Sequence, residues 1–176
     1  MSADAHDRWV TYLDEAESTA LYPESGTGSP MALAYVALGM VDEWYEHEQT
    51  IRGVRSGNYF HYDALKEFGD RFWYLARLER ELLQLVPSMN MWAQQFSPYN
   101  PLTAQELTFW IAGKVKKMLR QDKPADEAAV GIARAFLRLR YMMLSHPQAV
   151  EAMDLNAAKL RDRMERGVIK GSGDNR

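Results

Sequence analysis

The chain has 176 residues, a net charge of −3 and no cysteine. That length suits one domain, which buries about two thirds of its unfolded surface. A chain without cysteine has no disulfide, zinc–thiolate site or cysteine nucleophile. The charge gives no general attraction to nucleic acid. Because no apolar run approaches the roughly 18 residues of a membrane span and the N-terminus is polar, we expect a cytosolic protein with no membrane contact.

The N-terminal third predicts a short helix, a loop and the start of a long helix. Residues 4–18 are amphipathic, and the turn-forming residues 22–29 predict the loop. Ser29 followed by Pro30 is a helix start signal, with an N-cap before a proline at the first helical position. The expected apolar stripe of this long helix comprises Leu33, Val36, Met40, Trp44 and Ile51.

A second long helix is expected after a break at residues 52–58. It resumes near Asp63, and its apolar residues follow steps of three and four. Arg52 and Arg55 are expected in the intervening loop, either solvated or within reach of substrate phosphates. The stripe comprises Leu65, Phe68, Phe72, Leu75, Leu78, Leu82 and Leu85.

The C-terminal half predicts three more helices. Pro87 and residues 96–101 interrupt the pattern, and the capping box Thr103–Glu106 opens a helix that ends near Arg120. Another helix runs from residues 122–124 to His146, and the last runs from Pro147 to about Gly167. No segment alternates apolar and polar residues, so the fold class is all-α.

Two pairs of carboxylates lie on the two long helices. Glu43 and Glu46 form the first pair, and Glu67 and Asp70 form the second. Residues three apart are neighbours on a helix, so each pair can direct its oxygens to one point. Oxygen ligands suit Mg²⁺ or Mn²⁺. In the alternative interpretation these are solvated faces, and Glu67 pairs with Arg71 one turn later.

The carboxylate segments carry a resemblance to a family. Residues 35–46 and 65–75 resemble the E-x-x-E and E-x-x-D signature of the MazG-like all-α nucleoside triphosphate pyrophosphohydrolases. Residues 18–23 are similar to a segment upstream of the first motif in phage-type members. Residues 156–163 resemble their N-x-x-K-L-x-x-R element, and residues 166–176 resemble their C-terminal tail.

The chain also departs from the family pattern. Asp42, Trp44 and Tyr45 stand where members usually have small residues in the first motif. We expect a single domain over residues 1–176, a MazG-like helical bundle with a helical insertion at about 86–150. The basic residues of the insertion are interpreted as a solvated face, or as contacts to nucleic acid or to the substrate tail. The insertion is also interpreted as a degenerate second copy that makes a pseudo-dimer. Its basic residues are Lys114, Lys116, Lys117, Arg120, Arg134, Arg138 and Arg140.

The resemblance implies Mg²⁺-dependent hydrolysis of nucleoside or deoxynucleoside triphosphates to the monophosphate and pyrophosphate, with Mn²⁺ as a substitute. Glu43, Glu46, Glu67 and Asp70 would hold the metal, with one of them available as the base.

The resemblance also implies a set of substrate contacts. Lys159 and Arg163 would clamp the phosphates, and Asn156 would orient substrate or a ligand carboxylate. Trp73, on the Asp70 face, is a candidate platform for the base, or a core residue. His47 is interpreted as a surface or packing residue.

The family also implies a homodimer with a bundle around the active sites, acting in the cytoplasm, or in the host cytoplasm if a phage encodes it. The competing hypothesis is an inactive helical interaction module, or a protein that binds a signalling nucleotide without turnover. Trp44 and Tyr45 favour that hypothesis, and the four carboxylates oppose it.

Overall fold

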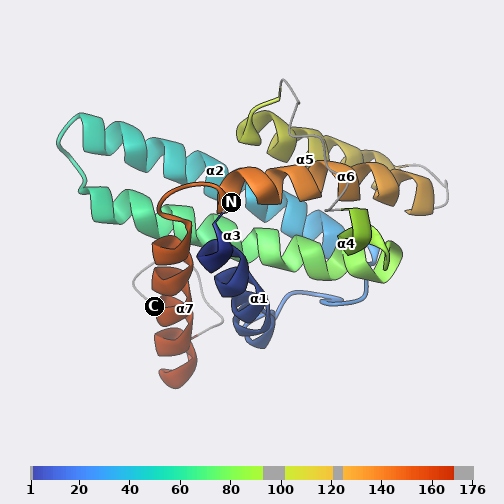
Figure 1. Cartoon of the computed structure of the whole chain (residues 1–176), viewed down its shortest axis with the longest axis horizontal. Coiled ribbons are helices and arrows are strands. Elements are labelled where there is room, and N and C mark those ends of the chain that lie inside the picture. The colour runs from blue at the N-terminus through green and yellow to red at the C-terminus, as the bar shows by residue number, and fades with distance from the viewer. Residues whose placement is uncertain (1, 93–101, 121–124, 169–176) are drawn as a thin grey trace.

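The computed structural model describes residues 2–92, 102–120 and 125–168, and every regular element in these ranges is a helix (Figure 1). The all-α prediction is therefore confirmed for the described residues. None of the described helices is long and apolar enough to cross a membrane. The helices are α1 (Ala3–Ser18), α2 (Pro30–Arg55), α3 (His61–Leu85), α4 (Met89–Trp92), α5 (Ala104–Arg120), α6 (Ala125–Leu144) and α7 (Ala149–Glu165).

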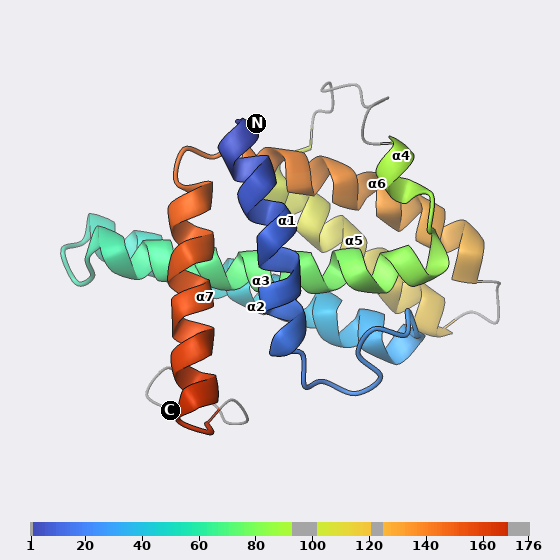
Figure 2. The same cartoon turned by 60° about the horizontal axis from the view of Figure 1, so that its bottom comes forward.

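Helix α3 is the central element. It forms an antiparallel hairpin with α2, and α5 and α6 pack alongside this hairpin, α5 against α2 and α6 against α3 (Figure 1). Helices α1 and α7 contact each other and cross α3 steeply (Figure 2). The hairpin thus has the α5–α6 pair on one side and the α1–α7 pair on another.

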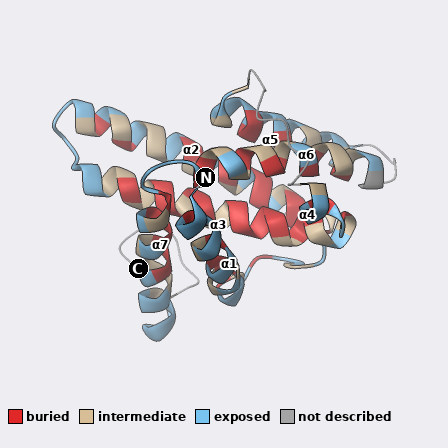
Figure 3. Cartoon of the chain, viewed as in Figure 1, coloured by how far each residue is buried: buried red, intermediate tan, exposed pale blue. Residues whose placement is uncertain are grey.

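The buried side chains concentrate on α3 and on the faces turned toward it (Figure 3). The expected stripes of α2 and α3 are buried except at their last positions, Ile51 and Leu85, which are intermediate in exposure. Burial of these apolar side chains is the main favourable term in folding. The largest fully buried side chains include Trp9, Tyr12, Phe72, Phe136, Leu33, Leu75, Leu78 and Leu82.

The helix start signals are used as expected. Ser29 Oγ accepts a hydrogen bond from the Ala32 amide at 3.1 Å. Thr103 and Glu106 form the reciprocal capping box: Thr103 Oγ1 accepts from the Glu106 amide, and Glu106 Oε2 accepts from the Thr103 amide. Each contact satisfies an amide that the helix itself leaves unpaired.

The sequence predicts a longer break between the two long helices than the structure has. Helix α2 continues to Arg55, so Arg52 and Arg55 lie in its last turn, not in a loop. A Cβ at Gly53 would lie 1.9 Å from the Tyr59 ring, so the missing side chain lets Tyr59 pack against the last turn of α2. Helix α3 begins at His61, before Asp63.

The described part of the chain contains one helix that the sequence pattern does not predict, the short helix α4. The interruption expected at 96–101 and the tail at 169–176 lie outside the described residues.

Two buried glutamates on α3 fix the segments around it. Glu81 accepts hydrogen bonds from the Gly26 and Gly28 amides at 2.7 and 2.8 Å, and so holds the loop before α2. Glu79 accepts from Trp9 Nε1 at 2.9 Å and from Arg140 Nη1 at 2.6 Å. The expectation that Arg140 belongs to a solvated basic face is therefore wrong, because it compensates a buried carboxylate.

Candidate functional site

Three of the four predicted carboxylates converge between α2 and α3. Glu43, Glu46 and Glu67 each offer one oxygen, and these oxygens lie within 4.8 Å of one another. The convergence follows from the antiparallel hairpin. Glu43 and Glu46 lie one turn apart on α2, and the hairpin places Glu67 of α3 opposite them. Oxygen donors grouped in this way suit a hard divalent cation such as Mg²⁺.

Glu43 is half-buried. Burial is the largest cause that raises its pKa, from 4.5 to about 9, and the charges of Asp70, Glu46 and Glu67 add to the effect. Its Oε2 atom is buried and makes no hydrogen bond with the described residues. Glu43 is therefore neutral at pH 7 without a cation, and it has an oxygen free to act as a ligand.

Asp70 lies beside the three glutamates and is held by α7. Its two oxygens accept hydrogen bonds from Asn156 Nδ2 and Lys159 Nζ, both at 2.6 Å. Asn156 is buried, and its Oδ1 accepts a hydrogen bond from the Tyr12 hydroxyl. This chain of contacts through α1, α7 and α3 fixes the orientation of the Asp70 carboxylate.

Two glycines bring the neighbouring groups close to the carboxylates. A Cβ at Gly69 would lie 2.5 Å from the backbone oxygen of Ala152, so α7 approaches α3 one residue before Asp70. A Cβ at Gly39 would lie 2.0 Å from the Tyr74 ring. The missing side chain of Gly39 therefore lets the Tyr74 ring pack directly against α2.

Aromatic rings gather beside Glu43. The rings of Tyr22 and Tyr35 stack at 4.7 Å between centroids, and Trp73 packs edge-on against Tyr22 and Tyr74. Trp73 Nε1 donates to Thr19 Oγ1 at 2.8 Å, which ties the ring to the loop after α1. Burial and nearby negative groups raise the pKa of Tyr74 well above its ordinary value.

The proposed phosphate clamp has two members on α7. Lys159 is engaged with Asp70, as described, and Arg163 lies one turn farther along the helix and is half-buried. Its contact with phosphates stays a prediction.

Arg71 faces away from the carboxylates. Its guanidinium lies 3.5 Å from the ring centroid of Trp44, and its Nη1 donates to His47 Nδ1 at 2.8 Å. The anticipated pairing with Glu67 does not form. Arg71 is only 7% exposed, and burial lowers its pKa to about 9, so it stays charged at pH 7. His47 is a packing residue, as predicted, stacked on Phe68.

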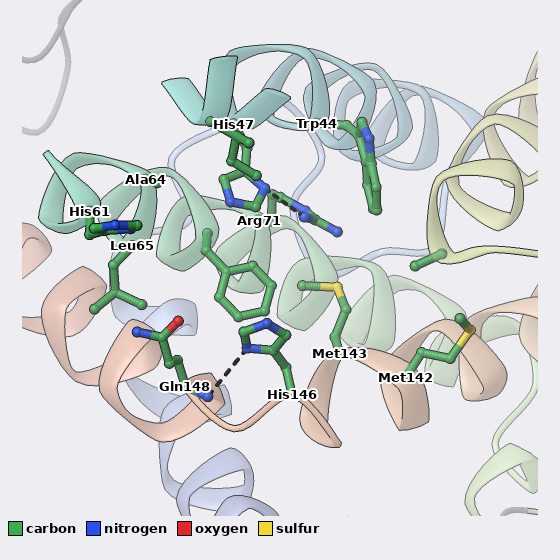
Figure 4. Close-up of a pocket in the computed structure, with 13 residues that line it drawn as sticks. Trp44, His47, His61, Ala64, Leu65, Arg71, Met142, Met143, His146 and Gln148 are labelled. Atoms are coloured by element: carbon green, nitrogen blue, oxygen red, sulfur yellow. Dashed lines mark hydrogen bonds between the residues drawn. The ribbon is translucent and has the colours of Figure 1, made fainter. Parts of the chain in front are cut away.

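A cavity of about 460 Å³ opens beside Arg71 (Figure 4). It lies between α2, α3, the start of α5 and the turn from α6 to α7. The sequence did not indicate it, because its walls come from segments about 100 residues apart. Its only sequence signal is an arginine next to the apolar stripe of a helix.

Comparison with known proteins adds no relative. No family model, no curated protein and no solved structure matches the chain.

Proposed function

We propose that the chain is a MazG-like, Mg²⁺-dependent nucleoside triphosphate pyrophosphohydrolase that releases a nucleoside monophosphate and pyrophosphate. The observation that carries the proposal is the convergence of Glu43, Glu46 and Glu67, with an unpartnered oxygen on Glu43. Without a cation, these carboxylates repel one another, and burial increases the cost of their charge. The donor set therefore fits Mg²⁺, with Mn²⁺ as a substitute.

When bound, Mg²⁺ would neutralise phosphate charge and lower the pKa of a bound water. The protein contributes the placement of the ligands. Asn156 and Lys159 fix Asp70 toward the glutamates, and the absence of a Cβ at Gly69 allows α7 to come close enough for this. The carboxylate that stays outside the metal shell serves as the base for the water.

Lys159 has a second role in this proposal. Without substrate it neutralises Asp70 at 2.6 Å, so the empty site carries less net negative charge. A triphosphate brings its own negative charge and competes for the same ammonium group, as it does for Arg163 one turn away. The aromatic group around Trp73 and Tyr35 supplies stacking surface for a base beside the carboxylates.

We further propose that two copies of the chain associate through α2. Its outer face carries an apolar stripe that the described helices leave uncovered, and Leu38 in that stripe is 69% exposed. Apolar side chains with this helical spacing, next to the carboxylates, suit a symmetric helix pair. The stripe comprises Met31, Tyr35, Leu38 and Tyr45.

The assembly proposal is tested with Leu38→Glu, measured by light scattering against Gln105→Glu, an exposed position on α5 outside the α2 stripe. A wild-type dimer that dissociates only in Leu38→Glu supports it. A monomeric wild type at high concentration contradicts it.

The activity is tested with a panel of ribonucleoside and deoxyribonucleoside triphosphates and guanosine tetraphosphate, with Mg²⁺ or EDTA, and ³¹P NMR of the products. We expect pyrophosphate to appear only with the metal. Glu67→Gln should lower turnover by about a hundredfold or more, since the metal and its water supply several kcal/mol. Asp42→Asn, an exposed carboxylate on α2, is the matched control and should leave turnover unchanged. Binding of a nucleotide without product would favour the sensor hypothesis instead.

A further inference from the structure

The cavity beside Arg71 is separate from the carboxylate cluster. The residues of α2 and α3 that line it include Trp44, His47, Phe68 and Arg71, whereas the carboxylates project from the neighbouring helix positions. Its other wall is Met142, Met143 and His146 from the end of α6 and the turn that follows. Its volume of about 460 Å³ is within the usual range for small-molecule sites, roughly 300–1,000 Å³.

Arg71 is an incompletely satisfied buried cation. Among the described residues, its guanidinium hydrogen-bonds only to His47 Nδ1 and pairs with no carboxylate. A guanidinium has five N–H donors, and buried charges are normally paired. The face of Trp44 offsets part of this cost through a cation–π contact, but it accepts no hydrogen bond in the plane of the guanidinium.

The polar groups around Arg71 favour an anion over a cation. No aspartate or glutamate occurs among the described residues that line the cavity. Because arginine only donates, His47 Nδ1 must accept, and the neutral ring carries its proton on Nε2. His146 Nδ1 accepts from the Gln148 amide at 3.2 Å, which leaves Nε2 as its donor as well (Figure 4). The lining thus offers several donors and one fixed positive charge.

Apart from a third histidine, His61, and the Gln148 side chain, the rest of the lining is mostly apolar. Met142, Met143, Leu65 and Phe68 surround the space next to the guanidinium. An inorganic anion alone would leave these side chains in contact with water. An apolar group attached to the anion would cover them.

We propose that this cavity binds a small organic anion, with a carboxylate or phosphate headgroup on Arg71 and an apolar body among the methionines and Phe68. This site is independent of the proposed hydrolase activity. Arg71 and a carboxylate or phosphate can form two parallel hydrogen bonds, and the buried setting strengthens them.

The test is calorimetric titration of the full chain in EDTA, without nucleotide, so that its result does not depend on the proposed activity. The probes are 3-phenylpropionate, phenyl phosphate, the neutral 3-phenylpropan-1-ol, and inorganic phosphate as the headgroup alone. At least one aromatic anion should bind about tenfold or more tightly than the alcohol, because only an anion pairs with Arg71. The anion that binds more tightly identifies the headgroup.

Variants separate a binding role of Arg71 from a packing role. Arg71→Met should reduce affinity for the anion about tenfold or more, to that of the alcohol, and Arg71→Lys should retain part of it. Arg52→Met, an exposed arginine on α2, is the control and should bind as wild type does. Ala64→Leu fills the cavity and should weaken binding of both the anion and the alcohol.

Equal affinities of wild type for the acid and the alcohol would overturn the proposal, as would undiminished anion binding by a folded Arg71→Met. If circular dichroism shows that Arg71→Met does not fold, the acid–alcohol comparison and Ala64→Leu decide the question. Failure of both aromatic anions to bind with a Kd below about 10 mM would also overturn it.

Discussion

Glu43→Gln should stabilise the metal-free protein, and the gain should depend on pH. The folded pKa of about 9 lies above the ordinary 4.5, so folding keeps Glu43 protonated while the unfolded chain ionises. The contribution of Glu43 to the free energy of unfolding is fully present below pH 4.5. It is lost progressively as pH rises toward 9. Each pH unit above 4.5 lowers the free energy of unfolding by about 1.4 kcal/mol, so the loss at pH 7.5 is about 4 kcal/mol. Relaxation of the site reduces this loss to about 2–4 kcal/mol. Glutamine keeps the shape and never ionises.

The assay is thermal unfolding in EDTA at pH 5 and pH 7.5, with Asp42→Asn as the exposed control. At pH 7.5 we expect Glu43→Gln to raise Tm by about 4–16 °C, given 2–4 °C per kcal/mol for a chain of this size. At pH 5 the gain should fall to under about 1 kcal/mol, because this pH is only half a unit above the ordinary pKa of 4.5, so the unfolded glutamate gains little free energy from ionising. A gain that is equal at the two pH values, or no larger than that of Asp42→Asn, would refute the reasoning.

Three further predictions concern the same site. Gly69→Ala should lower the free energy of unfolding, measured by chemical denaturation, by about 1–3 kcal/mol, because its Cβ would lie 2.5 Å from the Ala152 oxygen. Gly113→Ala is the control: its Cβ meets no atom within 4 Å, so this variant should be about 0.5–1 kcal/mol more stable than wild type. Lys159→Met should lower the free energy of unfolding in EDTA by about 1–3 kcal/mol, because it leaves the half-buried Asp70 carboxylate without its cation. An unchanged Tm would show that the 2.6 Å ion pair between Lys159 and Asp70 contributes nothing to stability. Titration of Mg²⁺ at pH 7 in buffers of different ionisation enthalpy should show release of about one proton per ion in wild type and none in Glu43→Gln.

The helices were predictable because each carries its own periodicity and start signal. Ser29 and Thr103 identify their helix starts from a few residues, and the stripes of α2 and α3 follow from local spacing. The convergence of three glutamates was also predictable, because antiparallel neighbours follow from a short connection. The family and the reaction have no such local test and stay predictions.

The contacts between distant segments were not predictable from spacing. Arg71, Glu79 and Glu81 are charged residues on one helix, and the sequence pattern favours exposure for all three. Their burial depends on partners from elsewhere: the loop before α2 for Glu81, α1 and α6 for Glu79, and the face of Trp44 for Arg71. Asp70 is a similar case, because its two donors come from α7, 86 and 89 residues later.

The inserted pair α5–α6 bears on how the molecule assembles. A pseudo-dimer in one chain would need this pair to replace a second copy around the carboxylates. Instead, Asp70 takes its two donors from α7. The first residue of α5, Ala104, and His146 in the turn after α6 line the Arg71 cavity on the other side of the hairpin. None of the described helices covers the stripe around Leu38. An uncovered apolar stripe beside the carboxylates is the arrangement expected if a second copy, rather than the insertion, completes that face, so the geometry favours a homodimer over a pseudo-dimer.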